Sequence, residues 1–196
     1  MKKVFAIAAA LMLIGTSAFA QSFGAGYVQS TKKVNNSSSV ANGFYAGFGY
    51  SAEIMPGLSL NPGLYYEFLT SNSSALGGIL SGKTTEHYVN VPLHLSFSLP
   101  LAPSFKLFVY GGPTANVGIA STTKGNIAGV VDTNTNNYED DDYSRFDILA
   151  GVGGGIEVMN KLRLTVGYDW GLLDRYTSEN YTLKRNRLTA GVAFIF

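Results

Sequence analysis

Large apolar side chains occupy every second position in several segments of the chain. The clearest segment covers residues 187–196, where the apolar positions are Leu188, Ala190, Val192, Phe194 and Phe196. The same period of two recurs in segments 22–30, 44–51, 58–68, 86–98, 105–119, 145–158 and 161–172. This period is typical of β-strands, whose successive side chains point to opposite faces of a sheet. The sequence therefore predicts an all-β chain of eight strands.

The two faces of these strands differ in character. One face carries large aliphatic and aromatic side chains with almost no charge, while the other carries glycine, tyrosine and charges of both signs. Eight strands enclose an interior just wide enough for side chains to fill. The bulky apolar face therefore fits lipid better than the interior, which favours a transmembrane barrel over a soluble β-domain. We predict an eight-stranded antiparallel up-and-down transmembrane β-barrel with both termini on the periplasmic side.

The predicted connections alternate between short and long. Short turns are expected near residues 55–57, 100–103 and 159–160. Long polar loops are expected near residues 31–42, 71–83, 121–142 and 174–183. This sorting is typical of outer-membrane barrels, which have short periplasmic turns and longer external loops.

Three prolines, Pro62, Pro92 and Pro113, lie inside predicted strands. Proline removes a hydrogen bond from the strand ladder and is unusual away from a sheet edge. We therefore expect β-bulges at these prolines and at the glycine run 153–155.

The first twenty residues have the pattern of a secretory signal peptide. Lys2 and Lys3 precede an apolar run over residues 4–14, and the sequence Ala18-Phe19-Ala20 provides an A-x-A cleavage site. The apolar run is too short for a membrane-spanning helix, which needs about 20 residues. We expect a signal peptide over residues 1–20 and a single barrel domain over residues 21–196. No cysteine follows the expected cleavage point, so we do not expect a lipoprotein.

Charged residues on the predicted inner face form the candidate site. They are Glu67, Glu86, Lys106, Arg145, Asp147, Glu157, Arg163, Asp169 and Arg187. Charges in a narrow lumen are costly unless they are paired. Two alternatives remain open at this point: a salt-bridge network that closes the lumen, and the lining of a water-filled ion path.

Aromatic residues are expected at both ends of the lipid-facing band, as in barrel girdles. On the loop side they are Phe44, Tyr66, Phe68, Phe146 and Trp170, and on the turn side they include Tyr50, Phe97 and Phe105.

Four short segments carry a family resemblance. Residues 88–97 (YVNVPLHLSF) resemble the L-x-I-P-L-x-L strand of the PorT-like outer-membrane β-barrel domain, and the glycine-rich segments 44–50 and 110–113 fit the same family. The C-terminal residues Val192, Phe194 and Phe196 resemble the signal read by the barrel-assembly machinery. The whole chain also resembles the small OmpX and OmpA barrels in architecture. The resemblance implies a bacterial outer-membrane location and contact with outer-membrane lipid, lipopolysaccharide and, during biogenesis, the assembly machinery.

Motifs for catalysis are weak. His94 and Ser96 resemble the His-x-Ser pair of lipid A deacylase barrels, but they fall on the predicted inner face, whereas that family's pair faces lipid. No phosphate-binding loop, dinucleotide motif or cysteine metal site is present, and the near-neutral charge gives no case for nucleic acid. We expect no enzymatic activity, no cofactor and no metal site.

The predicted function is that of a non-enzymatic surface protein, acting in adhesion, molecular contact or envelope integrity. The longest loop, near 121–142, is the expected contact surface. One alternative is a narrow porin-like channel for ions or small solutes. Another, implied by the family resemblance alone, is an accessory component of a secretion apparatus. A monomer is expected.

Overall fold

The computed structural model describes residues 19–34, 37–75, 80–127, 131–138, 144–175 and 183–196. Within these ranges no helix is long and apolar enough to cross a membrane. The described strands are β1 (Phe19–Val34), β2 (Ser37–Met55), β3 (Leu58–Ala75), β4 (Leu80–Ala102), β5 (Phe105–Ile127), β6 (Val131–Asn136), β7 (Phe146–Val158), β8 (Leu162–Gly171) and β9 (Leu183–Ile195). The predicted signal peptide falls almost entirely outside them, since they begin at Phe19 in β1.

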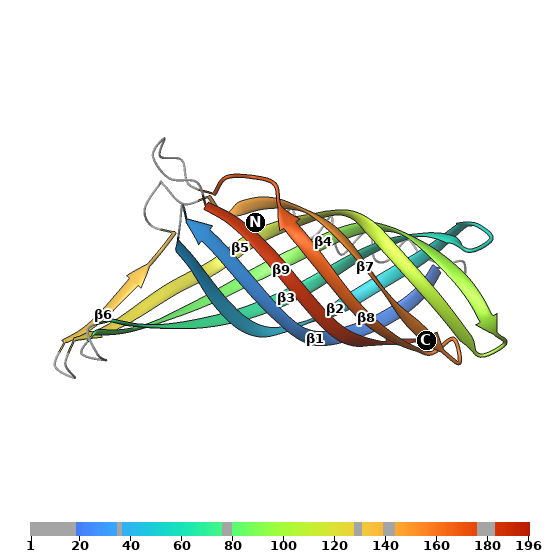
Figure 1. The fold of residues 1–196 in the computed structure, drawn as a ribbon, viewed down its shortest axis with the longest axis horizontal. Coiled ribbons are helices and arrows are strands. Elements are labelled where there is room, and N and C mark those ends of the chain that lie inside the picture. Colours follow the sequence, from blue (N-terminus) through green and yellow to red (C-terminus); the bar gives the residue numbers. More distant parts are fainter. Residues whose placement is uncertain (1–18, 35–36, 76–79, 128–130, 139–143, 176–182) are drawn as a thin grey trace.

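Eight of the described strands close into a ring through the pairing of β4 with β5. Figure 1 shows this barrel from the side. Every neighbouring pair is antiparallel, and β1 closes the ring by pairing with β9 from Ser22↔Ile195 to Val34↔Leu183. The short strand β6 lies outside the ring and pairs with β5. The predicted eight-stranded antiparallel barrel is confirmed.

The alternation of side chains along each strand places the apolar face outside. Val109, Val166 and Phe194 are exposed on the outer surface, whereas Glu67 and Asn116 are buried inside. In water, this arrangement would expose a continuous apolar surface, but in a bilayer the same surface is covered by lipid. The inner side chains are therefore the polar ones.

The three predicted short turns are confirmed. They connect β2 to β3, β4 to β5 and β7 to β8, and we call this end of the barrel the turn end and the opposite end the loop end. The turn between β7 and β8 places Met159 and Asn160 at a φ of 55° each. Such positive φ values suit tight hairpins, although they are unfavourable for a residue such as Met159.

The predicted loops near 31–42 and 71–83 are largely wrong. Strand β1 continues to Val34 and β2 starts at Ser37, while β3 continues to Ala75 and β4 starts at Leu80. The predicted loop near 121–142 contains the end of β5 and all of β6. These segments are rich in serine, threonine and asparagine, which is why their sequence suggests loops. Their strands nonetheless continue to pair beyond the apolar band, where polar side chains face water.

The bulges predicted at the prolines and at residues 153–155 are also wrong. The β2–β3 register is the same on both sides of Pro62, from Gly49↔Gly63 to Ala52↔Leu60. The ladder lacks pairs beside each proline but does not shift there, because proline removes one N–H group and requires no extra residue. The glycine run pairs continuously with both neighbouring strands.

Candidate functional site

Four charged side chains cross the lumen between its two ends, and we call Glu67, Asp169, Arg185 and Arg187 the central ion-pair layer. Arg187 donates from Nε to Asp169 Oδ2 and from Nη1 to Glu67 Oε2, both at 2.9 Å. Arg185 pairs with the other oxygen of Glu67. None of the four residues is more than 8% exposed. Because a buried charge is costly unless it is paired, each acid and base of the layer depends on the others.

Amide side chains extend this layer to further strands. Arg185 donates from Nη1 to Asn116 Oδ1 at 3.1 Å, Asn116 donates to Asn90 Oδ1 at 2.6 Å, and Asn90 donates to Glu67 Oε2 at 3.1 Å. These four side chains form a closed hydrogen-bonded ring. Arg185 also donates from Nε to Ser30 Oγ of β1 at 2.8 Å. Asp169, the member of the central ion-pair layer on β8, accepts from Arg187. Together these hydrogen bonds and ion pairs join six of the eight barrel strands.

Nearer the loop end, Glu86 is the centre of a second cluster. Lys32 Nζ lies 2.5 Å from Glu86 Oε1, and the Tyr88 hydroxyl donates to the same oxygen at 2.9 Å. The guanidinium of Arg185 lies 4.1 Å from the centre of the Tyr88 ring. Tyr88 therefore connects this cluster with the central ion-pair layer.

Arg175 closes the loop end from a segment that belongs to no strand. It is fully buried and donates from Nη1 to the Tyr88 hydroxyl at 3.0 Å. Its Nε and Nη2 donate to the Ser144 carbonyl at 3.2 and 2.9 Å, and Nη2 also donates to the Tyr138 hydroxyl at 3.4 Å. Side chains from two connections thus cap the lumen.

At the turn end, Glu157 accepts hydrogen bonds from two cations. Lys106 donates at 3.1 Å and Arg163 donates from Nη2 at 2.7 Å. The Lys106 and Arg163 side chains are 38% and 21% exposed, so this cluster is open to solvent. Two cations share one carboxylate, and we refer to these three residues as the turn-end cluster.

Tyrosine rings fill much of the remaining lumen because glycines lie opposite them. A Cβ added at Gly167 would overlap the Tyr110 hydroxyl, and one added at Gly191 would overlap the Tyr45 hydroxyl. Glycine therefore leaves the space at the barrel wall that each tyrosine occupies.

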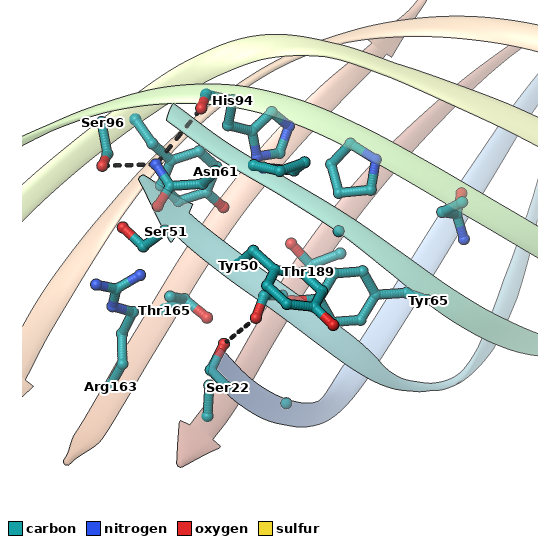
Figure 2. Close-up of a pocket in the computed structure, with 18 of the residues that line it drawn as sticks. Ser22, Tyr50, Ser51, Asn61, Tyr65, His94, Ser96, Arg163, Thr165 and Thr189 are labelled. Atoms are coloured by element: carbon teal, nitrogen blue, oxygen red, sulfur yellow. Dashed lines mark hydrogen bonds between the residues drawn. The ribbon is translucent and has the colours of Figure 1, made fainter. Parts of the chain in front are cut away.

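A cavity of about 160 Å³ is lined by Asp169 and Arg187 of the central ion-pair layer and by Arg163 of the turn-end cluster. Figure 2 shows Arg163 among the side chains of its wall. The rings of His94 and Tyr110 stack within it, with centres 5.0 Å apart. Its wall also includes Ser22, Tyr45, Ser51, Asn61, Tyr65, Ser96, Phe108, Arg163, Thr165 and Thr189. Arg187 and Asp169 line the same cavity, which places it directly beside the central layer.

Two of the predicted lumen residues differ from the rest. Arg145 is exposed, with its guanidinium 4.5 Å from the Tyr138 ring centre, and it donates to the Ile119 carbonyl at 3.2 Å. Strand β7 starts one residue later, so the alternation that would turn Arg145 inward does not reach it. Asp147 is fully buried, and within the described residues no side chain donates a hydrogen bond to its carboxylate. The charges of Arg175 and Arg185 act on it.

The sequence analysis missed three charged lumen residues, Lys32, Arg175 and Arg185. Lys32 lies on the inner face of β1, in a part of the strand that was predicted as a loop, and Arg185 lies on the inner face of β9, between the predicted loop near 174–183 and the predicted segment 187–196. Extending the alternation by two residues from Ser30 and from Arg187 would have found both. Arg175 lies outside the strands, so no periodic signal points to it.

The predicted lipid-interface aromatics mostly lie on the outer surface. Phe44, Tyr66, Phe97, Phe146 and Trp170 are exposed, and Phe68 and Phe105 are half-buried. Tyr50 differs, because it borders the lumen cavity. The C-terminal residues Val192, Phe194 and Phe196 are exposed on the outer face of β9 and at its end.

His94 and Ser96 have separate partners in the lumen. His94 Nε2 lies 3.2 Å from Thr114 Oγ1, and Ser96 Oγ accepts a hydrogen bond from Asn61 Nδ2 at 2.7 Å. A hydrolase would need its base and its nucleophile within hydrogen-bond reach of each other. In the described part of the chain, no three acidic, histidine or cysteine side chains gather as a metal site.

Comparison with known proteins gives matches to outer-membrane barrels. A family model described as "Outer membrane protein beta-barrel domain" matches residues 15–176. The solved structure of Ail from Yersinia pestis, in complex with the heparin analogue sucrose octasulfate, is similar with a TM-score of 0.54 and 13% identity, over 92% of this chain and 100% of that chain. Neisserial surface protein A is similar with a TM-score of 0.53 and 14% identity, over 93% of this chain and 99% of that chain. None of the curated proteins matches. The PorT-like part of the resemblance stays a prediction.

Proposed function

Because this chain belongs to the outer membrane protein β-barrel domain family and lies in the bacterial outer membrane, we propose that it is a non-enzymatic surface protein that binds a partner protein by strand pairing. The contact surface is the part of the sheet that extends from the loop end. In this proposal the lumen is a closed structural core that does not conduct ions.

The contact surface comprises residues 71–75 of β3, 80–85 of β4, 122–127 of β5 and β6, and we call it the projecting sheet. Strands β2 and β3 pair only as far as Asn42↔Thr70 in the described residues, so the sheet leaves the ring beyond this row. It continues through β4 and β5 to β6, which lies at the end of the molecule opposite the turns in Figure 1. The region near 121–142 that was predicted to be the contact loop therefore contributes strands to this sheet.

The edge of β6 that faces away from β5 at Asn134 is the observation that carries the proposal. Among the described strands, β6 pairs with β5 alone. Asn137 donates its backbone N–H to Ser121 of β5 at 2.9 Å. Because N–H directions alternate along a strand, the Thr135 N–H also points to β5, and the Asn134 N–H points away from it. An open strand edge can take up an extended segment of another protein.

Charge on the projecting sheet favours an acidic partner segment. Lys83 and Lys124 are exposed and directly opposite each other on β4 and β5, and Lys124 is in turn opposite Asn134 of β6. Like charges in such positions repel each other. The projecting sheet holds these two lysines and one acid, Asp132 of β6, so its net charge of +1 favours an acidic partner segment.

The structure of the lumen supports a closed core. The central ion-pair layer joins six strands through buried side chains, and Arg175 with Tyr138 caps the loop end. An open ion path would leave such side chains in contact with water. A channel remains the alternative that an electrical measurement tests.

The first experiment measures attachment of cells that express the chain to a panel of immobilised host-matrix proteins. Asn134→Pro removes the outward N–H of β6, and Asn134→Ala is the matched control that keeps this N–H. We expect the proline variant to lose most of the attachment and the alanine variant to keep it. Equal attachment by both variants would contradict strand pairing. If free heparin inhibits attachment while Asn134→Pro leaves it unchanged, the contact depends on charge and not on strand pairing.

The second experiment measures single-channel conductance of the refolded protein in a planar bilayer. We expect no stable current steps while heat-modifiable gel mobility shows a folded barrel. Stable steps from the folded protein would favour the narrow channel instead.

Lipid and biogenesis partners belong to the same proposal. The exposed outer aromatics fit contact with outer-membrane lipid and lipopolysaccharide. The exposed C-terminal Phe196 fits recognition by the barrel-assembly machinery. The proposed unit is a monomer, because the ring of eight strands closes on itself.

A further inference from the structure

The lumen cavity has the size and wall of a site for one small ring. Its volume is about 160 Å³, and a protein cavity of about 150 Å³ is known to hold benzene. The rings of Tyr45, Tyr65, Phe108 and Tyr110 border it together with His94. Tyr45 and Tyr65 lie edge to face with ring centres 5.8 Å apart, an arrangement that leaves flat aromatic surface for a further ring.

The end of the cavity at the turn-end cluster carries positive charge. Lys106 and Arg163 share the single carboxylate of Glu157. By contrast, the central ion-pair layer has two acids and two bases and is neutral. A carboxylate placed beside Arg163 would complete the charge balance, and guanidinium groups bind carboxylates with good geometry.

The turn end is the solvent-exposed end of the cavity, since the Lys106 and Arg163 side chains there are 38% and 21% exposed. Tyr65, His94 and Thr165 point into the lumen, yet they are only half-buried, so open space lies in front of them. Figure 2 shows the Arg163 guanidinium extending into the same region as Ser51 and Asn61. The central ion-pair layer closes the other end of the cavity.

We propose that this cavity binds a single-ring aromatic carboxylate of the benzoate class. The ring lies among the tyrosines and His94, and the carboxylate pairs with Arg163. This function is separate from the surface contact proposed above, because the projecting sheet lies at the opposite end of the barrel (Figure 1).

Isothermal titration of the refolded full chain in non-ionic micelles tests the ligand class. Sodium benzoate is compared with benzyl alcohol, which keeps the ring without the charge, and with acetate, which keeps the charge without the ring. We expect saturable binding of benzoate to one site and binding at least about tenfold weaker for the two others, a factor that one good polar contact provides. Absence of saturable binding, or equal binding of benzoate and benzyl alcohol, would overturn the proposal.

Two variants in the cavity region and one control variant on the projecting sheet test the location. Lys106→Gln removes the unmatched charge and should weaken benzoate binding severalfold, whereas Lys124→Gln removes the same charge from the projecting sheet and should change nothing. Ala193→Leu adds bulk to the cavity wall directly opposite Arg163 and should abolish binding. Unchanged binding by Ala193→Leu would place the ligand elsewhere. If the variants do not fold, the comparison of benzoate, benzyl alcohol and acetate on the unaltered chain still tests whether the protein binds this class of ligand.

Discussion

Arg187 donates from Nη1 to Glu67 Oε2 at 2.9 Å and thereby joins β9 to β3, which are separated in the ring by β1 and β2. Glu67 is fully buried and also accepts from Arg185. Glu67→Gln would remove the carboxylate that Arg185 and Arg187 share and leave Asp169 as the one acid of the central ion-pair layer. We expect a loss of about 3–5 kcal/mol in the free energy of unfolding, measured by urea titration in micelles.

Lys106→Gln is the control for this substitution, since it also removes one charge from a lumen ion pair. Its side chain is 38% exposed, so solvent screens the pair. We expect a loss of at most about 1 kcal/mol. Equal losses for the two variants would show that burial of the central layer does not control stability.

Gly167→Ala tests the packing of tyrosine against glycine. The added methyl group would overlap the Tyr110 hydroxyl, so we expect a loss of about 1–3 kcal/mol in the free energy of unfolding. Adding Tyr110→Phe to the same chain should restore part of this loss. Gly24→Ala is the control, because its nearest contact would be 3.3 Å away at Ala193. A double variant no more stable than Gly167→Ala alone would contradict this packing.

Val166→Arg tests which face of β8 meets lipid. Val166 is 58% exposed on the outer surface, and arginine near the middle of the bilayer should cost about 2–4 kcal/mol of unfolding free energy. Val40→Arg, near the loop end, should cost about 0–1 kcal/mol. Unfolding in lipid vesicles measures both, and a small cost at both positions would mean that this face of β8 does not lie in lipid.

Phe196→Ser tests the assembly signal. We expect less folded protein in the outer membrane of expressing cells, measured by heat-modifiable gel mobility. Refolding of the purified variant into micelles should be nearly unchanged, because no assembly machinery acts there. Leu188→Ser, on the same outer face of β9, is the control. Normal levels of folded Phe196→Ser in cells would contradict recognition of this residue.

The sequence predicts the barrel because the alternation of apolar and polar residues shows which side chains face lipid and which face the lumen. Val166 and Thr165 differ in polarity, so their faces could be assigned before the structure was known. The parts of the strands at the loop end show no such difference in polarity between their two faces. Thr84 and Thr123 are both polar, yet they pair across β4 and β5 with their hydroxyl oxygens 3.0 Å apart. Where both faces of a strand are polar, pairing alone decides between strand and loop, and a single sequence does not show pairing.

The charged lumen residues were likewise predictable only in segments with a clear alternation. Glu67, Asp169 and Arg187 follow from alternation within well-patterned segments. Arg185 was missed because the predicted strand begins at residue 187, whereas β9 begins at Leu183. Arg175 reaches the lumen from a connection after β8, and its position depends on how that connection folds back. The partners of each charge depend on strand register and on contacts across the ring, which no local pattern specifies.

Met159→Gly tests strain in the turn between β7 and β8. Met159 has a φ of 55° and is 70% exposed, so its side chain contributes little packing while its backbone conformation is unfavourable. Glycine adopts this conformation freely, and we expect the free energy of unfolding to rise by about 1 kcal/mol. Asn160→Gly, at the same φ, should give a smaller gain because asparagine tolerates this region better. Urea titration measures both changes, and a loss of stability for Met159→Gly would show that the methionine side chain stabilises the turn end.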